Sequence, residues 1–189
     1  MIGSLIGIIV SSGGVAASAG DYESIATTVV GSGGASSVTF SSIPSTYKHL
    51  QVRIIGKTDR ALNRDGAKVT FNGDTSTSYV SHYLYGDGAT AAAGYDSITT
   101  WSGIYRLSGN TSASNIFGSI VYDILDYADT NKNTTGRYVG GVDLNGAGEI
   151  YLGSTLFIKT NAISSISFAP VVGSNFLQYS SFALYGIKG

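Results

Sequence analysis

Residues 49–57 read HLQVRIIGK, and through most of this segment the character of the side chain changes from one residue to the next. Apolar and polar residues alternate through the segment, in the order Leu50, Gln51, Val52, Arg53 and Ile54. Successive side chains of a β-strand point to opposite faces of the sheet. The period of two therefore predicts a strand that turns one face to a core and the other to water.

Similar alternating or short apolar runs recur from Asp21 to the end of the chain, and clusters of Gly, Ser, Asn and Asp typical of turns separate them. The predicted strands are residues 22–30, 36–44, 49–57, 68–71, 79–85, 98–107, 116–125, 137–144, 149–158, 164–168 and 181–187. Because helical segments do not alternate with these strands, the pattern predicts an all-β fold. We expect residues 21–189 to form one jelly-roll-like antiparallel β-sandwich.

Three segments need separate treatment. Residues 119–129, SIVYDILDYAD, place Ile120 and Ile124 at helical spacing, so a helix is one interpretation. The β-branched and aromatic content of this segment favours a strand instead. Residues 31–37 and 88–97 are rich in Gly, Ala and Ser and are predicted to be loops, the second of them an exposed tip.

The first twenty residues, MIGSLIGIIVSSGGVAASAG, contain no charged side chain. Glycine and serine interrupt their apolar run, which falls short of the roughly 20 apolar residues that cross a bilayer, so a membrane span is not predicted. Residues 17–19, ASA, fit the cleavage pattern of a signal peptide, but the first basic residue is Lys48. One interpretation is therefore a signal peptide that lacks the usual positively charged N-terminal region. The other is a segment that docks on another protein.

The composition narrows the possible functions. A chain of 189 residues fits one domain, and 11 basic against 12 acidic residues leave no basic field for nucleic acid. The chain has no cysteine, which excludes disulfides, thiolate nucleophiles and cysteine-ligated zinc. Low charge combined with 26 Gly and 13 Tyr describes a neutral surface of the kind found in protein assemblies.

No pattern predicts a metal site. His49 and His82 lie in strand patterns without the spacing of metal ligands. Residues 129–136, DTNKNTTG, match the first three ligand positions of an EF-hand loop, but Thr134 stands in place of the required glycine and Gly140 in place of the bidentate glutamate. We expect a polar hairpin loop there, and no cofactor is predicted.

The sequence gives equally little support for a catalytic site. Glycoside hydrolysis needs two carboxylates around a sugar, and the chain has only two glutamates, Glu23 and Glu149. Asp123 and Asp126 could meet across a turn, but nothing in the sequence predicts separated pKa values for them. The sequence contains no nucleophile-elbow motif and no phosphate-binding glycine loop. We do not expect an enzyme, and glycan hydrolysis is the third class of function after assembly and adhesion.

Aromatic residues offer one candidate binding surface. Tyr95 and Trp101 lie close in sequence and could form a sugar-stacking surface on a β-sandwich. Tyrosine, phenylalanine and tryptophan also fill sandwich cores and subunit interfaces, and this interpretation is favoured.

Several phrases together resemble a family of small structural proteins of tailed bacteriophages, common in phages of cyanobacteria and other marine bacteria and described as virion structural or tail-fibre-like proteins. These phrases are residues 22–58, 69–88, 118–141 and 161–189, and the most specific of them is the ending SxFALYGIKG. The resemblance covers nearly all of residues 21–189. It implies a jelly-roll-like sandwich, a homotrimer, a place in the virion and no catalytic residues.

This resemblance also gives the N-terminal segment a role. Small residues would let its backbone approach a neighbouring subunit, while its apolar side chains would bury against that partner. The expected anchoring residues are Ile2, Leu5, Ile6, Ile8, Ile9 and Val10. We expect a non-enzymatic exterior protein, fibre-like or decorating, that residues 1–20 attach to other capsid or tail proteins. The alternative is a receptor-binding tail fibre protein that recognises host surface glycans. Neither nucleic acid nor a membrane is an expected partner.

Overall fold

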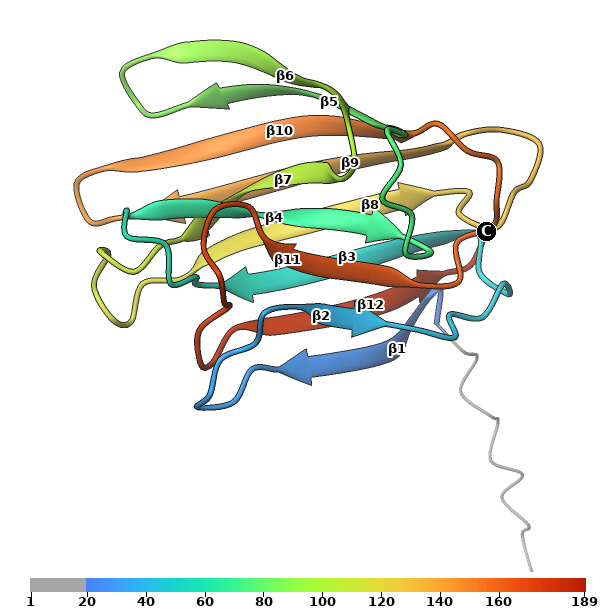
Figure 1. Ribbon diagram of the computed structural model, residues 1–189, viewed down its shortest axis with the longest axis horizontal. Helices are drawn as coiled ribbons and strands as arrows, with labels where there is room; N and C mark the ends of the chain where they lie inside the picture. The colour runs from blue at the N-terminus through green and yellow to red at the C-terminus, as the bar shows by residue number, and fades with distance from the viewer. Residues whose placement is uncertain (1–19) are drawn as a thin grey trace, which may run out of the picture.

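The computed structural model describes residues 20–189, apart from the side chain of Ile98, and this part of the chain forms twelve β-strands and no helix (Figure 1). The strands are β1 (Tyr22–Val29), β2 (Val38–Phe40), β3 (His49–Gly56), β4 (Arg64–Phe71), β5 (Tyr79–Gly86), β6 (Ala91–Thr99), β7 (Ser102–Ser108), β8 (Gly118–Leu125), β9 (Thr134–Asp143), β10 (Gly148–Phe157), β11 (Ile166–Pro170) and β12 (Ser181–Ile187). They form an eight-stranded sheet, β1-β12-β3-β8-β9-β10-β5-β6, and a four-stranded sheet, β2-β11-β4-β7. The predicted all-β sandwich is confirmed. Within the same residues, no helix could span a membrane.

The strand pairing is that of a jelly roll. The first four strands pair antiparallel with later strands in reverse order, β1 with β12, β2 with β11, β3 with β8 and β4 with β7. A long hairpin of this kind, wound around a core, gives two four-stranded layers. Two further hairpins, β5–β6 and β9–β10, extend one layer to eight strands, so that sheet is wider than its partner.

Strand β3 shows how local alternation sets the core. Leu50, Val52 and Ile54 are buried, as their spacing predicts, while Arg53 points outward and is exposed. Gln51 also points outward, but it is buried because neighbouring side chains cover it. Its amide nitrogen donates to Asp123 at 2.8 Å, and its oxygen accepts a hydrogen bond from Arg53 at 2.9 Å.

The predicted loop at residues 88–97 is wrong, because most of it is strand β6. This edge strand pairs antiparallel with β5, placing Ala93 opposite Leu84 and Gly94 opposite Tyr83. A Cβ atom at Gly94 would lie 2.7 Å from the ring of Tyr83. The small residues that suggested a loop therefore make room for a large aromatic side chain on the neighbouring strand.

The predicted strand at residues 98–107 is in fact two strands in different sheets. Strand β6 ends at Thr99 in the eight-stranded sheet, and β7 begins at Ser102 in the four-stranded sheet. An apolar run cannot indicate such a crossing, because both sheets face the same core. In contrast, the strand interpretation of residues 119–129 is confirmed, since Gly118–Leu125 forms β8.

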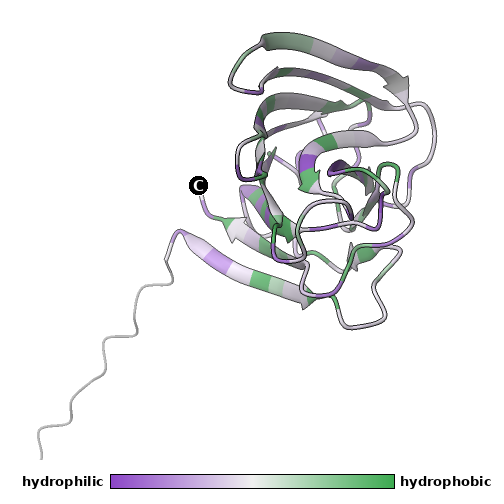
Figure 2. Ribbon diagram, turned by 90° about the vertical axis from the view of Figure 1, so that its left-hand side faces the viewer, coloured by the Kyte–Doolittle hydropathy of each residue, from purple (hydrophilic) through white to green (hydrophobic). Residues whose placement is uncertain are grey.

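Aromatic side chains dominate the core between the two layers, and Figure 2 shows hydrophobic residues recurring along the strands of both. Phe182 packs against Phe168 and Phe176, with ring centroids 5.6 and 4.8 Å away. Tyr79 and Phe157 stack at 4.9 Å. The largest fully buried side chains include four tyrosines, namely Tyr79, Tyr122, Tyr127 and Tyr138.

The buried tyrosines predict unfolding in base. Burial raises the pKa of Tyr79 to about 12, and burial likewise raises the pKa of Tyr122 and of Tyr138. An unfolded phenol ionises near its ordinary pKa of about 10, so these tyrosines contribute full stability below that pH. The stability is lost as the pH rises through about 12, the pKa of folded Tyr79. We expect phenolate absorbance and loss of β-type circular dichroism to appear together in one cooperative transition. Gradual phenolate formation with unchanged circular dichroism would contradict this.

Candidate interaction surface

The outer face of the eight-stranded sheet carries most of the exposed apolar side chains. Of the thirteen large hydrophobic residues whose described side chains are exposed, nine lie on this face, the other four being Leu62, Ile158, Val172 and Tyr179 in loops. We call these nine the outer sheet surface: Tyr22, Val29, Ile55, Leu84, Tyr95, Val121, Val139, Ile150 and Leu152. Soluble monomers expose single apolar residues routinely but large contiguous apolar patches rarely.

Strand register makes part of this surface continuous. Val121 lies opposite Val139, Val139 opposite Leu152, and Leu152 opposite Leu84. The row crosses four neighbouring strands, and its side chains are 41 to 59% exposed. With strands about 4.8 Å apart, it is roughly 14 Å long. Ile150 extends the patch along β10, since it lies two residues from Leu152 on the same face.

Polar groups border the apolar row on one side. Asp123 accepts hydrogen bonds from Gln51 at 2.8 Å and from Arg137 at 3.3 Å, and all three residues lie in the next row of the sheet. A hollow of about 410 Å³ lies beside the row, lined among others by Leu84, Leu152 and Arg137. An apolar centre with a polar border is the usual arrangement of a protein–protein interface.

The structure separates the two aromatic residues proposed for glycan binding. Tyr95 lies on β6, is 66% exposed and stacks on His82 at 5.8 Å. Trp101 lies just before β7, in the other sheet, where its ring contacts the ammonium of Lys68 at 5.4 Å. The two rings therefore have different neighbours, and Tyr95 belongs to the outer sheet surface.

The predicted anchoring residues lie outside the described part of the chain. They are Ile2, Leu5, Ile6, Ile8, Ile9 and Val10. The first strand, β1, begins at Tyr22 and forms one edge of the eight-stranded sheet. In the sequence, residues 1–20 therefore come just before an edge strand of the sheet that carries the outer sheet surface.

The acidic pairs considered for catalysis are held in separate ion pairs. Asp126 binds Lys132 and Lys48, and these contacts lower the pKa of Asp126 to about 2, whereas Asp123 contacts Arg137. The side chain of Glu149 is only 8% exposed and binds Arg106 and Arg64, whereas Glu23 binds Lys188. Among residues 20–189, no three His, Asp or Glu side chains lie close enough to hold a metal ion.

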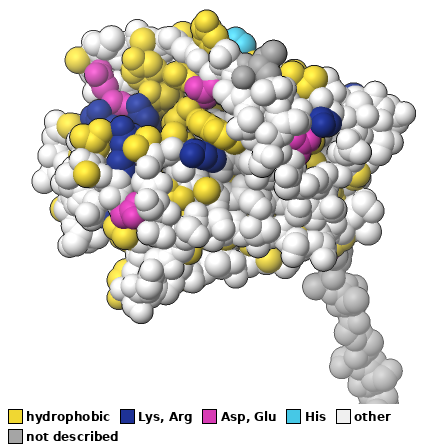
Figure 3. All heavy atoms as spheres, in the orientation of Figure 1, with side chains coloured by type: hydrophobic (Ala, Val, Ile, Leu, Met, Phe, Trp, Pro, Cys, Tyr) yellow, Lys and Arg dark blue, Asp and Glu magenta, His cyan; other side chains and the backbone are white. Residues whose placement is uncertain are grey.

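Four tyrosines close the sandwich where the eight-stranded sheet extends beyond its partner. Tyr85 and Tyr151 stack at 4.9 Å, and Tyr83 and Tyr105 meet edge to face at 5.5 Å. The guanidinium of Arg106 lies 4.1 Å from the ring of Tyr151. Figure 3 shows hydrophobic side chains gathered in the upper left of that view, with basic side chains beside them. These contacts stabilise the β5–β6 extension.

Sequence reasoning missed the apolar row, although a signal for it exists. Strand β9 alternates Tyr138 with Val139, and β10 alternates Tyr151 with Leu152, so large apolar residues face both sides of each strand. A strand that is apolar on both faces is typical of a sheet covered on both sides. Only the register shows that these outward residues are neighbours. Comparisons with protein-family models, curated proteins and solved structures found no match to this chain.

Proposed function

We propose that this protein is a non-enzymatic structural protein of a bacteriophage virion, an exterior fibre-like or decorating jelly roll. The outer sheet surface carries the proposal, because it includes a contiguous apolar row on a domain with few charged residues. The resemblance of the sequence to structural proteins of tailed phages supports the same role. In this role the outer sheet surface packs against another subunit of a homotrimer, and residues 1–20 attach the trimer to capsid or tail proteins.

In this proposal, the outer sheet surface and the N-terminal segment have separate roles in assembly. The outer sheet surface binds a neighbouring subunit. Its side chains lie on strands whose backbone is already ordered before contact, so little conformational entropy is lost on binding. The N-terminal segment contributes apolar area from six Ile, Leu and Val side chains, at about 25 cal/mol for each Å² buried. Assembly therefore needs no chemical step and no cofactor.

A receptor-binding tail fibre is the second candidate, and exposed Tyr95 favours it, since a solvent-facing ring beside His82 could stack on a sugar. The number of copies per particle separates the two roles. A copy number that follows the capsid lattice supports decoration, and one that follows the few tail fibres supports adhesion.

Replacing Leu152 with arginine is expected to dissociate the oligomer. Leu152 is 54% exposed, so Leu152→Arg leaves the folded monomer intact but puts an unpaired charge into the centre of the interface. We expect association to weaken about a hundredfold or more, measured by analytical ultracentrifugation. Val172→Arg is the matched control, because Val172 is 60% exposed in a loop outside the surface. An unchanged oligomer in Leu152→Arg would rule out this surface as the subunit interface.

A further inference from the structure

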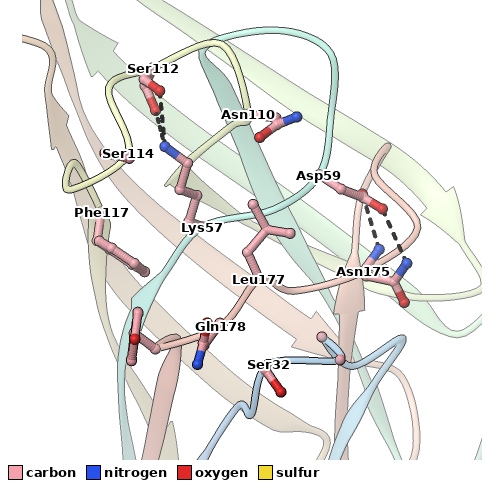
Figure 4. Close-up of a pocket in the computed structure, with 13 residues that line it drawn as sticks. Ser32, Lys57, Asp59, Asn110, Ser112, Ser114, Phe117, Asn175, Leu177 and Gln178 are labelled. Carbon is pink, nitrogen blue, oxygen red and sulfur yellow. Dashed lines mark hydrogen bonds between the residues drawn. The ribbon is translucent and has the colours of Figure 1, made fainter.

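A hollow of about 460 Å³ lies at one end of the sandwich, between four loops (Figure 4). Strands β1, β12, β3 and β8 are antiparallel neighbours, so β1 and β3 end where β12 and β8 begin. The loops that follow β1 and β3 therefore meet those that precede β8 and β12. Hollows of this size accommodate small ligands.

Tyr179 lines this hollow in an unusual backbone conformation. Its φ angle is +71°, a region that bulky residues rarely adopt, and its side chain is 69% exposed. It occupies the third position of a turn that Ser180 closes by donating its backbone N–H to Leu177 O at 3.1 Å. Glycine or asparagine ordinarily fills such a position. Strained residues of this kind cluster at binding sites.

The turn that carries Tyr179 is firmly held. The backbone nitrogen of Tyr179 donates to Val30 O at 3.0 Å. The hydroxyl of Ser180 accepts a hydrogen bond from Lys57 N at 3.0 Å and donates to Lys57 O at 3.1 Å. The backbone that carries the exposed ring is therefore held at the ends of two strands before any ligand arrives, which reduces the entropy lost on binding.

The charged groups in the hollow are already satisfied by the chain. The ammonium of Lys57 donates to Ser112 O and Oγ, both at 3.0 Å, and to Ala113 O at 2.7 Å. Burial also lowers the pKa of Lys57. The carboxylate of Asp59 accepts hydrogen bonds from Ser174 N and from the backbone and side-chain nitrogens of Asn175, as Figure 4 shows for Asn175. Both groups therefore use hydrogen bonds within the chain, and their opposite charges leave the lining of the hollow with no net charge.

The remaining polar side chains are free to bind. Within residues 20–189, the side chains of Ser32, Asn110, Ser114 and Gln178 make no hydrogen bond to another residue, and all four line the hollow. Amides and hydroxyls can both donate and accept. A ligand suited to them is neutral, carries many hydroxyl groups, and has one apolar face for an aromatic ring.

We propose that this hollow binds a neutral saccharide, with the ring of Tyr179 against the apolar face of one hexose and the side chains of Asn110 and Gln178 bonded to its hydroxyls. None of the residues of the outer sheet surface lines the hollow. The saccharide site is therefore separate from the assembly surface, and failure of one proposal leaves the other standing.

Calorimetry on the full chain tests the site, with neutral oligosaccharides of glucose, galactose and mannose as probes and oligogalacturonate as the acidic probe. We expect at least one neutral probe to bind, and Tyr179→Gly to weaken that binding about tenfold or more. Because glycine relieves the positive φ, this variant should be at least as stable as the parent in urea. Ile158→Ser is the matched control, since Ile158 is 41% exposed in a loop and belongs neither to the hollow nor to the outer sheet surface, and the affinity of this variant for the sugar should not change. Tyr95→Ser tests the other candidate sugar surface.

Three results would overturn the proposal: no binding of any neutral probe, binding of oligogalacturonate alone, or unchanged affinity in Tyr179→Gly. Affinity lost in Tyr95→Ser would instead place the sugar on the outer sheet surface. If Tyr179→Gly does not fold, Gln178→Ala gives the same test. Gln178 lines the hollow and has no hydrogen-bond partner for its side chain among residues 20–189, so its truncation should spare the fold and weaken sugar binding.

Discussion

Gly140→Ala is expected to remove a large part of the free energy that keeps the protein folded at room temperature. Strand β9 passes close to β7 at this point, where the backbone of Gly140 faces the backbone of Tyr105. An added Cβ atom would overlap the carbonyl oxygen of Tyr105 and lie 2.9 Å from its carbonyl carbon. Because the obstacle is backbone, the two sheets must move apart. We expect a loss of about 4 kcal/mol or more, against the 5–15 kcal/mol by which domains are usually stable.

The neighbouring glycine provides the control. A Cβ atom at Gly141 would lie 3.5 Å from Glu149 O, an ordinary contact. Gly141→Ala is expected to change the free energy of unfolding by less than about 1 kcal/mol. Urea unfolding followed by circular dichroism measures both variants. Equal stability of the two would show that β7 and β9 can separate without disturbing the core, contrary to the close approach at Gly140.

In the proposed role, deleting residues 2–20 should leave a folded sandwich that no longer enters the virion. All twelve strands lie between Tyr22 and Ile187, so the core can close without the segment. The double substitution Ile6→Asp and Ile9→Asp should act like the deletion, because an unpaired carboxylate in an apolar groove costs several kcal/mol or is forced to take up a proton. Incorporation into particles should fall to background for both variants, while β-type circular dichroism is retained.

Two outcomes would overturn this prediction in different ways. Unfolding of the truncated chain would make residues 2–20 part of the domain core. Incorporation at the parent level would exclude the anchoring role, and secretion with cleavage after residue 19 would then be the next hypothesis to test. Ile8→Val is a suitable control for the aspartate variant, since it keeps an apolar side chain at a neighbouring position.

Local pattern was enough to predict most strands. The alternation in residues 49–57 and the β-branched content of residues 119–129 both identified strands correctly, because side-chain period is a property of the strand itself. The same reasoning failed at residues 88–97, where alanine and glycine form β6. The reason lies on another strand, because the ring of Tyr83 occupies the space beside Gly94.

Candidate sites were less predictable than strands. Tyr95 and Trp101 are six positions apart in sequence, yet the chain crosses from one sheet to the other between them. Tyr179 gave no signal at all, since nothing in the residues around it indicates a turn that needs a positive φ at a tyrosine. The apolar row from Val121 to Leu84 draws on four strands and depends on the register of three strand pairs.

The amino-acid sequence by itself determined the all-β class and the buried face of most strands, because alternation and turn chemistry act over a few neighbouring residues. Only the tertiary structure decided the jelly-roll pairing, the passage of β7 across Gly140, the apolar row on the outer face and the hollow beside Tyr179. Each of these depends on contacts between segments far apart in the chain, and a one-residue shift in register would turn every side chain of a strand to the opposite face.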